Sequence, residues 1–270
     1  MSEEKKSLIN IELIPKELIT NVLGPSSIAL GEGLGGIVNY ILLPLRKLNV
    51  VKEKEYNDFI EKINGKTDTI PVENRDVSKI GLALKLMEDT RYQLEEKEMR
   101  EYCANLLAGL VDNRKNIHST PRFSTILSNL TVTDIKLLEV IIKSPKSVAA
   151  LISLAVYNKE TSVGMDSLPN IVLDGNDYHF EPLSFETLNA YNLLEIHHND
   201  ELVNSPFPKI YDEFEKSSDF QKIVTSQYEL FKNQFDITFE TFGISMEKGF
   251  VTLSETGRTF SSFIFGMEQE

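Results

Sequence analysis

A glycine-rich run near the start of the chain has the spacing of a nucleotide-binding loop. Gly31-Glu32-Gly33-Leu34-Gly35-Gly36 satisfies the G-x-G-x-x-G pattern. Such a loop cradles a pyrophosphate only when a strand precedes it and a helix follows it within a βαβ unit. Here Pro25-Ser26-Ser27 precedes the run, and no strand with an acidic residue follows at the usual distance. We therefore reject nucleotide binding and interpret the glycines as a site of close helix packing or of a bend.

Two groups of histidines and acids have residue types that bind metal ions. One is His197-His198-Asn199-Asp200, and the other combines Asp174, Asp177 and His179. Adjacent residues on a strand point to opposite faces, so His197 and His198 are poorly placed to share one ion. We interpret both groups as solvated strand ends and predict no metal site.

A lone cysteine and a group of glutamates are the remaining candidates for catalysis. Cys103 lies on an apolar helical stripe with no histidine near it in sequence, so we expect a buried thiol and not a nucleophile. A paired-carboxylate site would need burial to separate the pKa values of its two acids. We expect the candidate acids to be solvated in the first turn of a helix; they are Glu95, Glu96, Glu98 and Glu101. No catalytic residue and no cofactor is therefore predicted, and the chain is not expected to be an enzyme.

The charge of the chain is concentrated in its second half. The net charge of the 270 residues is −13, and residues 131–270 contain 10 Lys and Arg against 22 Asp and Glu. This half should repel nucleic acid at long range, so we do not expect a nucleic-acid partner. The single cysteine excludes an internal disulfide, and no apolar stretch reaches about 18 residues. We predict a cytoplasmic protein, with association at a membrane surface as the alternative.

Helical periodicity dominates the first half of the chain. The spacing of apolar residues predicts amphipathic helices within residues 56–63, 77–87, 95–113 and 123–130. The strongest is 95–113, whose apolar stripe comprises Met99, Cys103, Leu106, Leu107 and Leu110. We predict that residues 1–130 form a helical domain that includes the glycine-rich apolar segment.

The second half mixes helix and strand patterns. We predict helices at 131–143, 147–158, 184–194, 220–234 and 255–267. A hairpin is expected where Asp174-Gly175 separates residues 171–173 from 178–180. Further strands are expected at 193–197, at 242–246 and, after a turn at 247–249, at 250–253. The fold class predicted is mainly α, with residues 131–270 as a winged-helix-like α+β domain.

A winged-helix domain raises the alternative of a DNA-binding transcriptional regulator. The helix at 184–194 would occupy the recognition position, but it contains no lysine or arginine. Major-groove readers usually contact bases and phosphates with these two residues. We prefer a winged-helix-like shape that serves packing or protein contact. A nuclease is the third reading, and the missing constellation of acids and histidines argues against it.

The segment most tied to function is the glycine-rich window and the apolar run behind it. A cluster of glycines is tolerable mainly where the backbone must bend or be approached closely. The candidate contact residues for a protein partner or a membrane are Gly31, Gly33, Gly35, Gly36, Ile37 and Ile41. Self-association is one form that this contact would take.

The order of several motifs resembles the abortive infection alpha family of bacteria and phages. The likeness is carried by Glu98-Met99-Arg100-Glu101-Tyr102-Cys103-Ala104-Asn105-Leu106-Leu107-Ala108 and by the segments 121–127 and 130–138. It continues through 185–194 and through Leu253-Ser254-Glu255-Thr256-Gly257-Arg258. Asn192 departs from the family, which tends to have glycine before the strand. The resemblance spans most of residues 20–265.

The resemblance implies a role in phage defence by abortive infection, and it implies no catalytic residues. Together with the absence of a reactive constellation, it leads us to predict a non-enzymatic component of phage defence. We expect it to act through a protein partner or a membrane contact.

Overall fold

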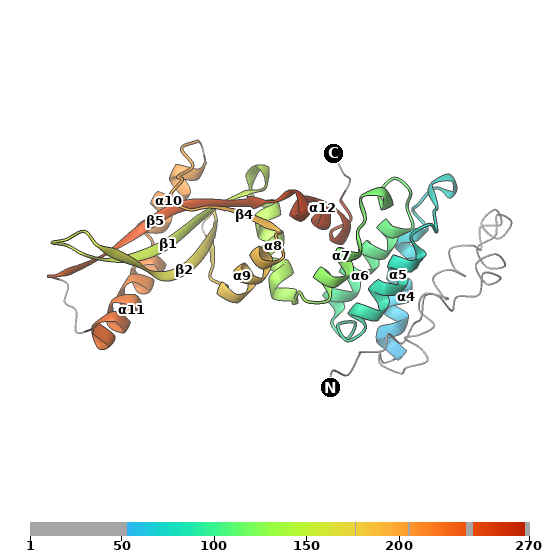
Figure 1. Ribbon diagram of the computed structural model, residues 1–270, viewed down its shortest axis with the longest axis horizontal. Coiled ribbons are helices and arrows are strands. Elements are labelled where there is room, and N and C mark those ends of the chain that lie inside the picture. The colour runs from blue at the N-terminus through green and yellow to red at the C-terminus, as the bar shows by residue number, and fades with distance from the viewer. Residues whose placement is uncertain (1–52, 176, 205, 236–239, 268–270) are drawn as a thin grey trace, which may run out of the picture. The chain divides into compact units, whose positions relative to one another are not determined.

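The chain is described by a computed structural model over residues 53–175, 177–204, 206–235 and 240–267. The predicted contact residues Gly31, Gly33, Gly35, Gly36, Ile37 and Ile41 lie outside these residues. The described chain combines helices with one antiparallel sheet, which makes it an α+β protein (Figure 1). It divides into two compact units, Met1–Val132 with Thr259–Glu270 and Thr133–Arg258. We call them the helical unit and the sheet unit and describe each by itself.

The helical unit contains the helices expected from the apolar periodicity of the first half. They are α4 (Glu53–Thr67), α5 (Ile80–Thr90), α6 (Lys97–Leu110) and α7 (Pro121–Leu127), with short 3₁₀ turns η2 (Val72–Asn74) and η3 (Asn116–His118). Proline in the first turn starts α7, where its missing N–H costs no helical hydrogen bond. The second part of α12 (Glu255–Ile264) belongs to the same unit.

The predicted apolar stripe of α6 is confirmed. Its five members are buried, and Cys103 and Leu107 are fully enclosed; the five are Met99, Cys103, Leu106, Leu107 and Leu110. Burial extends beyond the stripe to Ala104 and Gly109. A helix buried over this much of its circumference is a central element of its unit and not a surface helix.

The end of α12 packs against α6 and α7 through aromatic rings. Phe123 of α7 lies 5.6 Å from Phe260 and 5.4 Å from Phe263, measured between ring centroids. Gly109 permits this approach, because a Cβ there would lie 2.5 Å from Cδ1 of Phe263. A glycine in the last turn of α6 therefore serves close packing of an aromatic ring.

The sheet unit is built on one sheet of five described strands in the order β3-β2-β1-β5-β4, all antiparallel. The strands are β1 (Val148–Asn158), β2 (Gly164–Asp174), β3 (Asp177–His179), β4 (Leu194–His197) and β5 (Phe242–Leu253). Its helices are α8 (Val132–Lys143), α9 (Pro182–Ala190), α10 (Phe207–Glu215) and α11 (Ser218–Phe235), with the turn η4 (Pro145–Ser147) after α8. The predicted hairpin is confirmed as β2 and β3, with Gly175 at a φ of 59° in the turn.

The predicted helix at 147–158 is wrong, because these residues form β1. β1 is the central strand and pairs with β2 on one side and with β5 on the other. Ala149, Ala150, Leu151 and Ile152 are all buried. A strand covered on both faces shows a continuous apolar run instead of an alternating pattern, and alanine and leucine made that run look helical.

The predicted turn at 247–249 is also wrong, since β5 runs without a break from Phe242 to Leu253. Gly249 is needed inside the strand because a Cβ would lie 2.3 Å from the carbonyl oxygen of His197. Its carbonyl oxygen accepts a hydrogen bond of 2.5 Å from the hydroxyl of Tyr211. This glycine therefore marks a close backbone approach within the strand.

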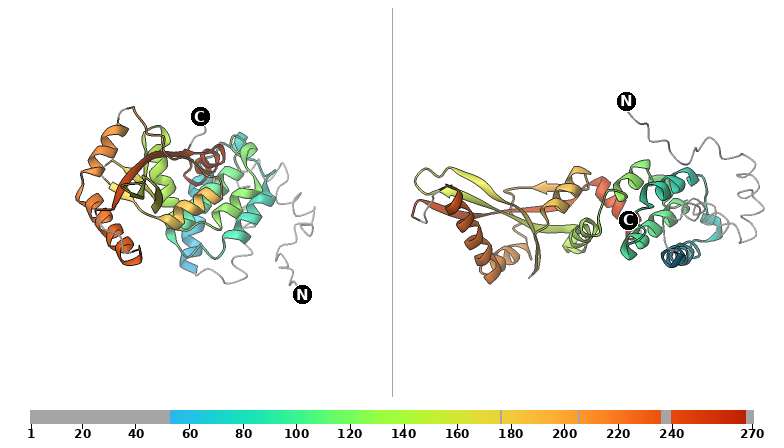
Figure 2. Two further views of the ribbon diagram at one scale, coloured as in Figure 1. Left: turned by 60° about the vertical axis from the view of Figure 1, so that its left-hand side comes forward. Right: turned by 90° about the horizontal axis from the view of Figure 1, so that it is seen from below.

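Helices α10 and α11 cover one face of the long end of the sheet, and the far ends of β1, β2 and β5 project past them (Figures 1 and 2). The apolar layer beneath the helices comprises Ala150, Ile152, Leu154, Leu168, Ile171, Leu173, Phe207, Tyr211, Phe214 and Phe220. On the opposite face, several side chains toward the projecting end of the sheet are small or polar. They line a hollow of about 980 Å³ whose floor includes Ser153, Ala155, Ser245 and Glu247.

Two helical glycines should respond to alanine with opposite signs. Gly257→Ala should lower the free energy of unfolding by about 1–3 kcal/mol, because its Cβ would lie 2.0 Å from the carbonyl oxygen of Leu193. In Gly81→Ala, the added Cβ in α5 meets no heavy atom within 4 Å. This variant should raise the free energy of unfolding by about 0.5 kcal/mol. Urea denaturation of the two variants measures both changes. A shift of the same sign in both would contradict this packing.

Candidate functional site

The thiol of Cys103 is not available for chemistry. It is fully buried on α6, and burial raises its pKa to about 12, against a smaller opposing effect of a hydrogen bond with Thr90. At neutral pH the sulfur is therefore protonated and shielded from solvent. The prediction that Cys103 is buried is confirmed.

The two histidines at the end of β4 lie in different surroundings. His197 stacks on the ring of Phe250 of β5, with a centroid separation of 4.2 Å and an interplanar angle of 10°. His198 instead lines the hollow on the open face of the sheet. Asp174 and Asp177 face each other across the exposed hairpin end. In the part of the chain that the structure describes, no three His, Cys, Asp or Glu residues lie close enough together to hold a metal ion.

The glutamates at the start of α6 separate into two kinds. Glu95, Glu96 and Glu98 are exposed, as expected for a solvated first turn. Glu101 is different, because it accepts hydrogen bonds from Lys62, at 2.8 Å, and from Lys66 of α4. Burial raises the pKa of Glu101, but these two ammonium groups outweigh burial and the net pKa lies below its usual range. Glu101 is thus a charged anchor for α4.

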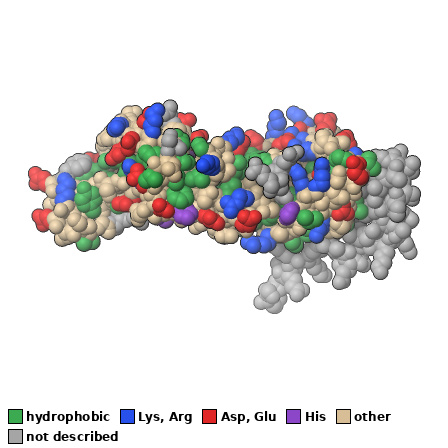
Figure 3. Space-filling view, turned by 90° about the horizontal axis from the view of Figure 1, so that it is seen from above, with side chains coloured by type: hydrophobic (Ala, Val, Ile, Leu, Met, Phe, Trp, Pro, Cys, Tyr) green, Lys and Arg blue, Asp and Glu red, His purple; other side chains and the backbone are tan. Residues whose placement is uncertain are grey.

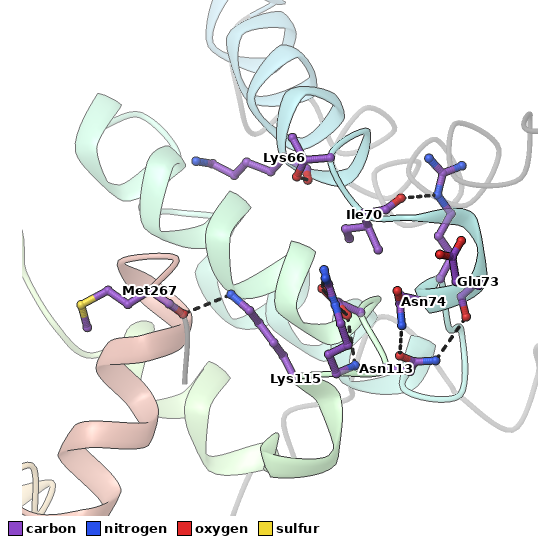
Figure 4. A network of polar contacts seen from close by, with 11 residues as sticks. Lys66, Ile70, Glu73, Asn74, Asn113, Lys115 and Met267 are labelled. Atoms are coloured by element: carbon purple, nitrogen blue, oxygen red, sulfur yellow. Dashed lines mark hydrogen bonds and ion pairs between the residues drawn. The ribbon is translucent and has the colours of Figure 1, made fainter. Parts of the chain in front are cut away.

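A groove of about 760 Å³ lies beside α6. Gly65, Ala108 and Gly109 are among its small lining residues, and its charged ones are Lys66, Glu101, Asp112, Arg114 and Lys115. Figure 4 shows this region, with Lys66 on one side and Lys115 reaching across to Met267. It is the described hollow most closely tied to the segment 98–108, because Glu101, Asn105 and Ala108 all line it.

Two side chains in this groove hold the carbonyl groups at the end of α12. Asn105 donates from Nδ2 to the carbonyl oxygen of Ile264 at 2.7 Å, and Lys115 donates from Nζ to that of Met267 at 3.1 Å. Gly266 has a φ of 66°, the left-handed conformation that commonly ends a helix. Free carbonyl groups at a helix end favour a nearby cation, which Lys115 supplies.

The other polar residues near α6 also bond to their own chain. Arg100 is almost fully buried; its Nε contacts Asp58 at 2.6 Å, and its Nη1 donates to the carbonyl oxygens of Leu94 and Glu95. Asp112 binds Arg114 through both carboxylate oxygens. On the far side of the groove, the side chain of Asn74 bonds that of Asn113 at 3.0 Å (Figure 4). These charges and amides hold elements of the helical unit together.

The sequence matches a known family model over most of its length. The model described as abortive infection alpha matches residues 51–264, which include the whole of the described core of both units. The chain belongs to the abortive infection alpha family. No curated protein matches the sequence.

One solved structure shows a weak likeness to the chain. It is an uncharacterised protein from the hydrocarbon-degrading marine bacterium Alcanivorax borkumensis SK2, with 17% sequence identity and a TM-score of 0.33. The match covers 57% of this chain and 96% of the other. At that TM-score it carries no conclusion about fold.

The residues that carried the family resemblance have structural tasks. Within 98–108, Met99, Cys103 and Leu107 fill the core, while Arg100, Glu101 and Asn105 bond to neighbouring segments. Near the end of β5, Ser254 accepts a hydrogen bond from the N–H of Gly257 and donates one to the carbonyl oxygen of Asn192.

Asn192, where the family tends to have glycine, has a φ of 56°. Only glycine adopts this left-handed conformation freely, and asparagine tolerates it better than most residues. Asn192 therefore adopts before β4 a backbone conformation that glycine would also adopt.

Lys62, Lys66 and Lys115 were not predicted as site residues. Each binds a group that lies at least 35 residues away in sequence. A surface lysine in an amphipathic helix has no local signal that identifies such a partner. Glu101 was predicted to be solvated together with its neighbours for the same reason.

Glu101→Gln should destabilise the protein at neutral pH by up to about 1 kcal/mol. Folding lowers the pKa of Glu101. The contribution of its carboxylate to stability is therefore complete above the usual pKa, and it is lost as the pH falls through the lowered pKa of the folded state. The difference in melting temperature between parent and variant should therefore be constant near pH 7 and vanish in strong acid. Glu98→Gln, on the exposed side of the same helix, is the matched control and should change little. An equal loss at pH 7 in both variants would show that the Lys62 and Lys66 contacts do not stabilise the fold.

Proposed function

We propose that the chain acts in abortive infection as a binding component and not as a catalyst. The observation that carries the proposal is membership of the abortive infection alpha family over residues 51–264. The geometry of the described residues supports it in a specific way. Cys103 and Glu101 are two of the residues that the sequence offered as candidates for catalysis. The thiol of Cys103 is buried and protonated, and the carboxylate of Glu101 is bonded to two lysines.

We propose further that the partner is a protein, with a membrane surface as the alternative. Among the described residues, no helix combines the length and hydrophobicity needed to cross a bilayer. The contact that we predict uses the glycine-rich segment, with Gly31, Gly33, Gly35, Gly36, Ile37 and Ile41. We place this activity in the cytoplasm.

We propose that the winged-helix-like shape serves protein contact and not DNA binding. In the sheet unit, α9 is followed by the antiparallel pair of β4 and β5, which is the order expected of such a motif. The exposed residues of α9 carry no basic group; they are Leu183, Glu186, Asn189 and Ala190. On the face seen in Figure 3, acidic and basic side chains are interspersed over the described surface. A recognition helix of this composition suits a protein surface better than DNA.

Gly35→Leu should abolish protection against phage while leaving the described fold intact. The added side chain fills space that we predict a partner or bilayer must approach closely. The measurement is the plating efficiency of a phage panel on cells expressing each variant, with circular dichroism of the purified proteins. Gly81→Ala, a change in a helix with free space around it, is the matched control and should protect like the parent.

A folded Gly35→Leu protein that protects fully would remove the glycine-rich segment from the mechanism. Failure of the parent chain itself to protect against any phage would contradict the proposed function as a whole.

A further inference from the structure

The outer edge of β5 is only partly covered. β4 pairs with residues 250–253 of β5 and then ends. The rest of β5, from Phe242 to Gly249, pairs with β1 on its inner side. Within the described residues no strand lies along the outer side of this part. It lies toward the end of the sheet that projects past α11 (Figure 1).

Two hydrogen bonds fix which backbone groups of β5 point outward. The N–H of Lys159, at the end of β1, donates to the carbonyl oxygen of Thr241 at 2.9 Å. The N–H of Ser254 donates to Leu193, on the β4 side, at 3.0 Å. Backbone groups alternate in direction along a strand, so odd-numbered residues face β1 and even-numbered residues face outward. Phe242, Ile244 and Met246 therefore present their N–H and C=O groups on the open edge.

The opposite edge of the sheet is protected against pairing, whereas this one is not. β3 covers the end of β2, and the remainder of β2 contains Pro169, which has no N–H to donate. The pairing of β2 with β1 is also irregular next to Leu154. Proline and irregular pairing are common devices that keep a sheet edge from joining another strand. The segment from Phe242 to Met246 has neither.

We propose that this edge pairs with the same edge of a second copy of the chain, antiparallel about a two-fold axis at Ile244. Outward-facing residues must oppose one another, which restricts the register to axes at even-numbered residues. The axis at Ile244 uses the whole open edge, with Phe242 opposite the partner's Met246. The next pair outward sets Lys248 opposite the partner's Glu240, once on each side of the axis.

The side chains suit this register on both faces. The apolar residues Phe242, Ile244 and Met246 meet their counterparts on the helix-covered face, while Gly243 and Ser245 meet on the open face. Opposed residues of an antiparallel pair contribute most when they are apolar or of opposite charge, and like charges oppose pairing. Lys248 already lies 3.1 Å from Glu201 and 3.8 Å from Asp212, so the partner's Glu240 would be a third carboxylate near this ammonium group. The isologous contact produces one continuous sheet across two copies.

This inference goes beyond phage defence, because it concerns only the partner that the β5 edge accepts.

The parent chain should have twice its monomer mass of 30.6 kDa in light scattering at micromolar concentration. Glu240→Lys places like charges at both ends of the ladder and should weaken the dimer about tenfold. Glu229→Lys makes the same charge change on the exposed surface of α11 and should not.

Ile244→Cys tests the register directly. Opposed residues in a hydrogen-bonded antiparallel pair have Cα atoms about 5.5 Å apart, within the range of a disulfide. Mild oxidation should convert this variant into a covalent dimer, while the native Cys103 is buried and does not interfere. Val163→Cys, at a more exposed position in the turn after β1, is the control and should cross-link far less. A monomeric parent at all concentrations, or equal cross-linking of the two cysteine variants, would overturn the proposal.

Discussion

Burial of α6 on several sides is the constraint on which the helical unit depends. Its apolar stripe packs into the core, and Gly109 lets the ring of Phe263 approach the backbone. Its polar residues also bond to neighbouring segments. Arg100 bonds to the preceding loop and to α4, Glu101 bonds to α4, and Asn105 bonds to the end of α12. A segment whose apolar and polar faces are both occupied by its own chain has little freedom to vary. This explains why its pattern is the most recognisable part of the sequence.

Because the motif residues of α6 have structural roles, we look for the function elsewhere in the molecule. Motif residues near a groove are natural candidates for catalysis, but here the charges in the groove neutralise one another or cap a helix. The parts of the molecule that remain available for recognition are surfaces and edges. Among the described residues, the outer face of α9 and the open edge of β5 are such places, and the glycine-rich segment, which lies outside the described residues, stays a prediction from the sequence.

The sequence predicted elements well where a single local signal decides the structure. The 3.6-residue spacing of Met99, Cys103 and Leu107 identified α6 and its buried face, and Asp174-Gly175 identified the hairpin. It failed where tertiary surroundings decide. The first part of β1, residues 149–152, is buried on both faces, so its apolar run lacks the period of a strand.

Gly249 was wrongly predicted to lie in a turn. A glycine is required there because the backbone of β4 passes close to it, and the local sequence does not show that approach. α10 was not predicted; it begins beside Pro206 and Pro208, and proline is well tolerated in the first turn of a helix. The ion pairs of Glu101 with Lys62 and Lys66 join residues at least 35 positions apart, and neither partner carries a local signal. Local patterns therefore predicted the stripe of α6 but not the contacts that its polar side makes.

Native-state hydrogen exchange tests the dependence of the helical unit on α6 most directly. Because Asn105, Lys115 and the ring of Phe263 tie the end of α12 to α6, the amides of residues 260–264 should open together with those of α6. We predict that both sets exchange with the free energy of global unfolding, which marks the most stable unit of a protein. A helix near the end of a chain that is not anchored would fray, with opening free energies close to zero. Rapid exchange in residues 260–264 beside a fully protected α6 would contradict the anchoring role assigned to Asn105 and Lys115.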